Sequence, residues 1–222
     1  MRLASFLSGA SDAAFGAAHR NLVLRRRARV LAGRLAGLLP REGTVLDVGC
    51  GDGAIAAAIM QQRPAVSVVG VDVLVRPDAS IPVRGFDGRR LPFADDAFDA
   101  ALLVDVLHHT DDPMALLREA RRIARRSIVI KDHTCDGVLA WPTLRAMDRV
   151  CNARHGVRLP YNYWRADQWR DAFARLGLPV RHWDGRLRLY PWPASMVLDR
   201  DLHFAALLGV DRAADSSAGK VC

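Results

Sequence analysis

Two short polar clusters in this chain carry the residue types of a proton-transfer site. His108 and His109 follow one apolar run, and Lys131, Asp132 and His133 close the next one. Histidine titrates near neutral pH, and an adjacent carboxylate can orient it as a base. The structural alternative is a loop that shapes a pocket and a corner built from capping bonds and ion pairs. We take all five residues as candidate catalytic groups.

A glycine-rich turn lies earlier in the chain, after a short β-rich run over Thr44–Val48. The turn reads Gly49-Cys50-Gly51-Asp52-Gly53, and a helix is predicted from Ala54. Glycine lets the backbone turn tightly and approach a ligand closely, and the N-terminus of the helix faces the same place. The spacing of these glycines also fits a dinucleotide fingerprint. The glycines alone therefore leave the cofactor class open.

Three aspartates narrow the choice of cofactor. Asp47 stands two residues before the first glycine, where a carboxylate would repel a pyrophosphate but suits an amino group and a sulfonium. Asp72 ends the second apolar run and can accept hydrogen bonds from ribose hydroxyls, which both cofactor classes have. Asp87 follows a weak third strand, where it can accept from an adenine amino group.

Apolar runs that alternate with helical segments must position these groups. Such alternation predicts a parallel, doubly wound α/β sheet with ligands at the carboxyl ends of the strands. The predicted strands are 44–48, 66–71, 82–86, 98–104 and 127–131, and the predicted helices are 12–39, 54–61 and 114–125.

The chain changes character after His133. Helices are predicted over 137–154 and 165–176, and strands over 178–190 and 201–208. All the tryptophans and tyrosines fall between residues 141 and 192. We expect a helical, aromatic-rich cap whose pocket would be lined by Asn152, His155, Tyr161 and Tyr163. The alternative is an aromatic lid that only packs on the sheet.

Several segments together resemble the successive motifs of class I S-adenosylmethionine-dependent methyltransferases. They are VLDVGCGDG, VVGVDV, FDGRRLPFADDAFDAALLVDVLHHTDDP and RRIARR, within residues 44–133. They are most similar to the small-molecule branch that includes the ubiquinone and menaquinone biosynthesis enzymes. The resemblance implies a Rossmann-like, seven-stranded sheet with the last strand antiparallel and S-adenosylmethionine as cofactor. It implies cofactor-binding roles for Asp47, Gly49, Cys50, Gly51, Asp72, Val73, Asp87, Gly88, Asp105 and Val106.

The charge of the chain is concentrated at its N-terminus. The net charge is +8, and residues 1–41 contain eight arginines and one acid, Asp12, which gives +7. We expect a basic amphipathic helix there, with a solvated face or a contact to a membrane surface or an acidic acceptor as its role. The first residues make a poor signal peptide, and no apolar run reaches 18 residues. These features predict a cytoplasmic protein, with peripheral membrane contact left open.

We predict a single domain over residues 1–222, with a basic helical segment (1–41), a cofactor half (42–133), an acceptor-side elaboration (134–200) and a final strand (201–210). The predicted reaction is O- or C-methylation of a small apolar or aromatic metabolite or lipid intermediate. RNA methylation and non-catalytic cofactor binding are the alternatives. The charge-balanced remainder and the absence of an RNA-binding module disfavour nucleic acid. The sequence leaves the oligomeric state open.

The sequence predicts no metal site. Asp132, His133 and His155 could supply ligands, but no metal-binding spacing supports them. The cysteines (Cys50, Cys135, Cys151 and Cys222) show no zinc-ligand spacing either, and free thiols are expected.

Overall fold

A seven-stranded sheet forms the centre of the protein, in a computed structural model that describes residues 26–152 and 159–211. The strand order is β3-β2-β1-β4-β5-β7-β6. Strand β7 is antiparallel to both of its neighbours, while the first five strands run parallel. This arrangement confirms the predicted Rossmann-like sheet with an antiparallel last strand. The strands are β1 (Gly43–Val48), β2 (Val66–Asp72), β3 (Val83–Gly85), β4 (Phe98–Val104), β5 (Ala124–His133), β6 (Val180–Asp184) and β7 (His203–Gly209).

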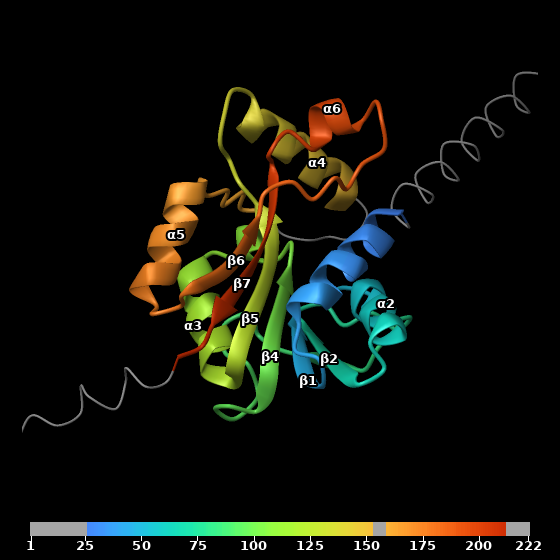
Figure 1. The fold of residues 1–222 in the computed structure, drawn as a ribbon, viewed down its shortest axis with the longest axis vertical. Helices are drawn as coiled ribbons and strands as arrows, with labels where there is room; N and C mark the ends of the chain where they lie inside the picture. The colour runs from blue at the N-terminus through green and yellow to red at the C-terminus, as the bar shows by residue number, and fades with distance from the viewer. Residues whose placement is uncertain (1–25, 153–158, 212–222) are drawn as a thin grey trace, which may run out of the picture.

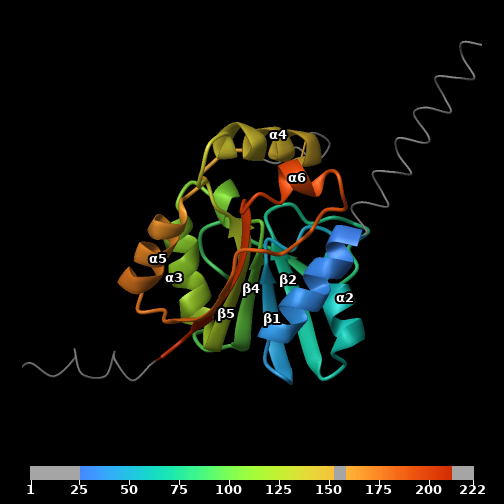
Figure 2. The same ribbon diagram turned by 45° about the horizontal axis from the view of Figure 1, so that its top comes forward.

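Helices cover both faces of the sheet (Figure 2). The helix over residues 26–38 and α2 (Ala54–Gln62) lie on one face, and α3 (Pro113–Ile123) and α5 (Ala166–Arg175) lie on the other. Side chains of a strand alternate between the two cores, because successive residues point to opposite faces. In β4, for example, Ala101 and Leu103 pack with α3, whereas Ala100 and Leu102 pack with the N-terminal helix.

A small cap lies over the carboxyl ends of the central strands (Figure 1). It consists of α4 (Ala140–Asn152) and the short α6 (Ser195–Leu198). Its own apolar core is formed by Ala140, Leu144 and Leu202, with Tyr163 packed against them. Beneath the cap lies the 3-10 turn η1 (Leu107–His109), which directly follows β4. The cap therefore covers the histidine pair and the end of β5.

The aromatic residues are divided between the cap and the sheet. Trp169 and Phe173 of α5 are fully buried in the core beside α3, and Trp183 of β6 stacks on Phe204 of β7 with centroids 4.2 Å apart. Helix α5 is therefore a layer of the sandwich and no part of a cap. The predicted strand over 178–190 is also much shorter, because β6 ends at Asp184 and a loop carrying α6 follows.

Other boundaries agree closely with the expectations. Asp112 caps α3 by accepting from the Ala115 amide at 2.9 Å, with Pro113 in the first turn. Strand β5 begins at Ala124, three residues before the expected start. No helix within residues 26–152 and 159–211 has the length and apolarity to cross a bilayer. Residues 12–25 of the expected basic helix, and His155, lie outside the described residues.

Candidate active site

The carboxyl end of β1 places Asp47 in the middle of the sheet, between Gly70 of β2 and Leu102 of β4. Its side chain is only 3% exposed, and its Oδ1 atom has no hydrogen-bond partner. Burial, assisted by the charge of Asp72, raises the pKa of Asp47 to about 7. A buried carboxylate oxygen without a partner is costly, so the site fits a ligand that supplies a donor or a positive charge.

The glycine turn follows β1 directly and has no room for a side chain at Gly49 or Gly53. Gly49, Gly51 and Gly53 all have positive φ angles of 59–70°. A Cβ atom on Gly49 would lie 2.3 Å from Val106 Cγ2. Asp72 at the end of β2 accepts a hydrogen bond from the Gly51 amide at 2.8 Å, which ties the turn to the neighbouring strand. Glycine is therefore required for both the conformation and the close approach.

The next two strand ends carry the other expected cofactor contacts. Val73 is 66% exposed and is followed by two more exposed apolar residues, Leu74 and Val75. Asp87 and Gly88 follow β3, which pairs with the end of β2. Asp87 accepts from the amides of Arg89 and Arg90, and these bonds lower its pKa.

These residues fit S-adenosylmethionine. Asp47 offers the negative charge that an amino group and a sulfonium require, and the exposed Val73–Val75 segment offers an apolar surface to a flat base. Cys50, also expected at this site, is half-buried, and burial with Asp47 nearby raises its thiol pKa to about 12. The thiol therefore stays protonated, and Cys50 behaves as a small apolar side chain.

Asp105, at the end of β4, joins two strands to the N-terminal helix. It has a left-handed backbone conformation with φ 54°. Its carboxylate accepts hydrogen bonds from Lys131 of β5 and from Arg27. Burial raises the pKa of Asp105, but these two cations outweigh it and hold the pKa well below its usual range. Arg27 was not among the predicted site residues, because nothing in the local sequence distinguishes it from the other arginines of the helix.

Lys131 is fully buried and has no contact to solvent. Burial lowers its pKa, partly opposed by Asp105. Its Nζ atom also lies 3.3 Å from Nδ1 of His203, the first residue of β7. His133 is close by, with Nε2 3.5 Å from an Asp105 oxygen. Burial and the charge of Lys131 lower the pKa values of His133 and His203 well below the usual histidine value.

His108 is held between two carboxylates from different elements. Its Nδ1 atom lies 2.6 Å from Asp132 of β5, and its Nε2 atom lies 3.4 Å from Asp148 of α4. Tyr163 donates a hydrogen bond to the same Asp148 oxygen. Burial lowers the pKa of His108, but the two carboxylates outweigh it and raise the pKa to about 10. Asp148 was missed as a site residue, because only the tertiary fold brings α4 over η1.

His109 is the half-buried member of the pair. Its ring lies 3.9 Å from that of His108, and its Nδ1 atom is buried without a hydrogen-bond partner. Burial and the neighbouring His108 lower its pKa to about 4. His109 is therefore a neutral imidazole at physiological pH and offers a lone pair to a ligand.

The structure thus brings all five predicted catalytic residues to one edge of the sheet. Four of them are buried, and His109 alone is partly accessible. Of the predicted acceptor residues, Tyr163 belongs to this cluster, and the ring of Tyr161 lies 6.1 Å from it, beneath the Arg145 guanidinium. Asn152 lies at the end of α4, and its side chain is not described.

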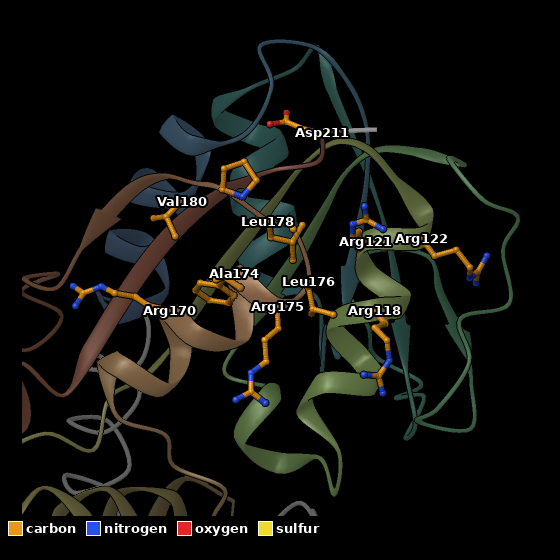
Figure 3. A pocket seen from close by; sticks show the side chains of 13 residues that line it. Arg118, Arg121, Arg122, Arg170, Ala174, Arg175, Leu176, Leu178, Val180 and Asp211 are labelled. Atoms are coloured by element: carbon orange, nitrogen blue, oxygen red, sulfur yellow. The ribbon is translucent and has the colours of Figure 1, made fainter. Parts of the chain in front are cut away.

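A separate groove of about 900 Å³ lies between α3 and α5 (Figure 3). One of its lining residues is Asp211, which follows the end of β7. That end of β7 pairs with the start of β5, so the groove lies near the amino ends of the parallel strands, at the opposite edge of the sheet from Asp47. Ligands of open α/β sheets bind at the carboxyl ends of the strands, and the groove is at the wrong end. Its lining is rich in arginines: Arg118, Arg121, Arg122, Arg170 and Arg175.

Comparison with known proteins finds methyltransferases among the relatives of this chain. The curated 27-O-demethylrifamycin SV methyltransferase of Amycolatopsis mediterranei is 32% identical over 110 residues, which cover 43% of this chain and 40% of that protein. The ubiquinone/menaquinone biosynthesis C-methyltransferase of Desulfotalea psychrophila is 32% identical over 95 residues, or 39% of each chain. The chain thus spans about two fifths of the length of these relatives.

Solved structures share the whole fold at low identity. A putative methyltransferase of Haloferax volcanii, solved in complex with the Trm112 methyltransferase activator, has a TM-score of 0.62 at 18% identity and covers 89% of this chain and 96% of its own. A putative methyltransferase from Bacillus halodurans has a TM-score of 0.58 at 16% identity, covering 81% and 98%.

A family model described as a methyltransferase domain matches residues 19–182, which is most of the chain. The matched range contains the whole glycine turn, the acids that follow it and the histidine pair. The chain therefore belongs to the methyltransferase domain family, within the class I, S-adenosylmethionine-dependent group.

Proposed function

We propose that the protein transfers the methyl group of S-adenosylmethionine to an oxygen or acidic carbon of a small apolar or aromatic molecule. The observation that carries this proposal is the cap. Helix α4 lies over η1 and the end of β5, and its Asp148 contacts both His108 and Tyr163. A covered site of this kind suits a compact acceptor, since a long polymer would need an open surface.

The protein's own residues would divide the work between two ends of the site. When bound, S-adenosylmethionine supplies an electrophilic methyl group on a sulfonium. Asp47 would hold its amino group, the glycine turn its carboxyl end, and Asp72 and Asp87 its ribose and adenine. Positioning of the acceptor for in-line attack is the main requirement of such a transfer.

The histidine pair would act on the acceptor. His109 is neutral and its ring is partly exposed, so a ring nitrogen can accept a hydrogen bond from an acceptor hydroxyl. Asp132 and Asp148 hold His108 in place, and Asp105, Lys131 and Arg27 fix the strand ends beneath it. These five residues are positioning groups, because hydrogen bonds and ion pairs within the site hold each of them in place.

Relatives support the small-molecule class. The names of the two relatives above describe O-methylation of a demethylrifamycin and C-methylation in ubiquinone or menaquinone biosynthesis. Both names describe small-molecule acceptors and not a polymer. We extend only this broad class to the present chain.

The test is a methyl-transfer assay with labelled S-adenosylmethionine and two acceptor pools, an organic-solvent extract of metabolites and purified RNA. We expect label in the organic pool, with little dependence on salt, and none with the Asp47→Ala variant. The exposed Asp78→Ala variant is the matched control and should retain activity. Label in RNA that is lost as salt increases would refute the proposal in favour of RNA methylation. Cofactor binding without label in either pool would favour a non-catalytic binding protein.

A further inference from the structure

Three potential metal ligands converge beneath the cap. One ligand atom each from His108, His109 and Asp148 lies within 4.8 Å of the other two. The two histidines are neighbours in η1, whereas Asp148 comes from α4. Both His108 and Asp148 are buried, so bulk water has little access to their polar atoms.

Two nitrogen atoms of this cluster lack a well-formed hydrogen bond within the protein. His108 Nε2 and His109 Nδ1 are both buried without a hydrogen-bond partner. His108 Nε2 lies 3.4 Å from Asp148 Oδ2, at the outer limit of a hydrogen bond. Ligand atoms about 2.0–2.1 Å from a tetrahedral zinc ion are roughly 3.3 Å apart, so this separation matches that of two ligands on one ion.

The surrounding residues orient these groups as in a metal site. Asp132 lies 2.6 Å from His108 Nδ1, which orients the ring so that Nε2 faces Asp148, and a bound metal ion would take the place of the Nε2 proton. Tyr163 donates to the carboxylate of Asp148. A carboxylate behind a histidine ligand and a hydrogen bond to a carboxylate ligand are the usual outer contacts of metal ligands.

A second triad of His108, Asp132 and His133 is less suitable. Asp132 Oδ1 already faces His108 Nδ1 and accepts from the His133 amide at 2.8 Å, and Oδ2 accepts from the Leu107 amide at 3.1 Å. Donors thus occupy both oxygens of Asp132, which leaves this carboxylate as an orienting group.

We propose that His108, His109 and Asp148 form a site for one divalent transition-metal ion, with zinc as the best match to two imidazoles and a carboxylate. Three protein ligands leave an open coordination position, as catalytic rather than structural zinc sites do. The open position would take an oxygen of the acceptor, which replaces the direct hydrogen bond to His109 and narrows the acceptor to molecules with a hydroxyl, enol or carbonyl group. This last step rests on the proposed function, whereas metal binding itself does not.

The ligand spacing explains why the sequence did not reveal the site. Neighbouring histidines followed by a distant aspartate match no familiar metal motif. Only the placement of α4 over η1 brings the three side chains together.

The test is direct metal binding to untagged, chelator-treated protein. We expect one Co²⁺ per chain with the visible d–d bands of a four- or five-coordinate site and no thiolate charge-transfer band, and displacement of Co²⁺ by one Zn²⁺. The His109→Gln and Asp148→Asn variants should lose affinity for Zn²⁺ at least 100-fold, and Asp132→Asn should lose 10- to 100-fold. The His182→Gln variant removes an exposed histidine of β6 and should bind as the wild type does.

Calorimetric binding of S-adenosylmethionine by each variant shows that its fold is intact and separates this test from that of the methyl-transfer proposal. If the wild type gives no cobalt spectrum, or if the His109→Gln and His182→Gln variants bind Zn²⁺ equally well, the proposed site does not exist. Specific Zn²⁺ binding without methyl transfer would uphold the metal site and contradict the proposed function instead.

Discussion

The buried carboxylate of Asp47 should make the ligand-free protein less stable as the pH rises. Its pKa is raised from 3.8 to about 7, and its Oδ1 atom lacks a partner. The change to test is Asp47→Asn, which keeps the shape of the side chain but cannot ionise. We expect this variant to be more stable than the wild type at alkaline pH and to bind S-adenosylmethionine poorly.

The magnitude follows from the linkage between protonation and folding. A group whose pKa is raised in the folded state stabilises that state below its unfolded pKa, and this contribution is lost as the pH rises through the folded pKa. The window here runs from about pH 4 to about pH 7, at about 1.4 kcal/mol per pH unit. Between pH 5 and pH 8 the wild type should lose roughly 2–3 kcal/mol that Asp47→Asn does not lose. Solvent screening is a minor correction, because Asp47 is only 3% exposed.

The assay is urea unfolding at pH 5, 6, 7 and 8 for the wild type, Asp47→Asn and the control Asp78→Asn. The difference in unfolding free energy between Asp47→Asn and the wild type should grow with pH, whereas that for the exposed Asp78 should stay constant. S-adenosylmethionine at 100 times its Kd should stabilise the wild type by about 2.7 kcal/mol and the variant by much less. A pH-independent difference, or equal stabilisation of both proteins by the cofactor, would refute the reasoning.

Two further predictions concern the glycine turn and the N-terminal helix. Gly49→Ala should destabilise the protein by about 1–3 kcal/mol in urea unfolding and weaken cofactor binding in calorimetry, because its Cβ would overlap Val106; no loss of either would contradict the close approach. Arg27→Gln should cost about 1 kcal/mol and speed amide hydrogen exchange in residues 26–38, since it removes an ion pair with the partly exposed Asp105. The exposed Arg29→Gln should change neither quantity, and an equal effect of both substitutions would show that the ion pair does not hold the helix.

The cofactor half of the protein was predictable because its signals are local. Apolar runs without alternation predicted the buried strands, and Asp112-Pro113 predicted the start of α3. Gly49, Gly51 and Gly53 have positive φ angles, and a residue with a side chain would strain the backbone at these positions. The carboxyl ends of parallel strands meet at one edge, so Asp47 and His108 could be placed together before the fold was known.

The acceptor half was less predictable because its contacts join distant segments. Asp148 reaches His108 only because α4 crosses over the carboxyl ends of the strands, and Arg27 reaches Asp105 only because its helix packs on the sheet beside β4. The aromatic residues led to the prediction of a larger cap than the structure has, because the local sequence around a tryptophan does not show whether it lies in a cap or in the main core. Trp169 is held in the core by α5 and by a hydrogen bond from its ring nitrogen to the His133 carbonyl, 2.9 Å away.

The loop that carries α6 connects two strands that lie side by side. Asp184 at the end of β6 pairs with Ala205 of β7, so both ends of this loop are anchored at neighbouring positions of the sheet. Doubling the length of a flexible loop with fixed ends costs only about 0.6 kcal/mol. Insertions and deletions in the exposed part of the loop around α6 can therefore accumulate during evolution, while the buried Leu187 and Leu189 keep the loop packed on the sheet. Related proteins can diverge in what they methylate by altering one hairpin connection, and the same segment is the natural place to graft new acceptor specificity.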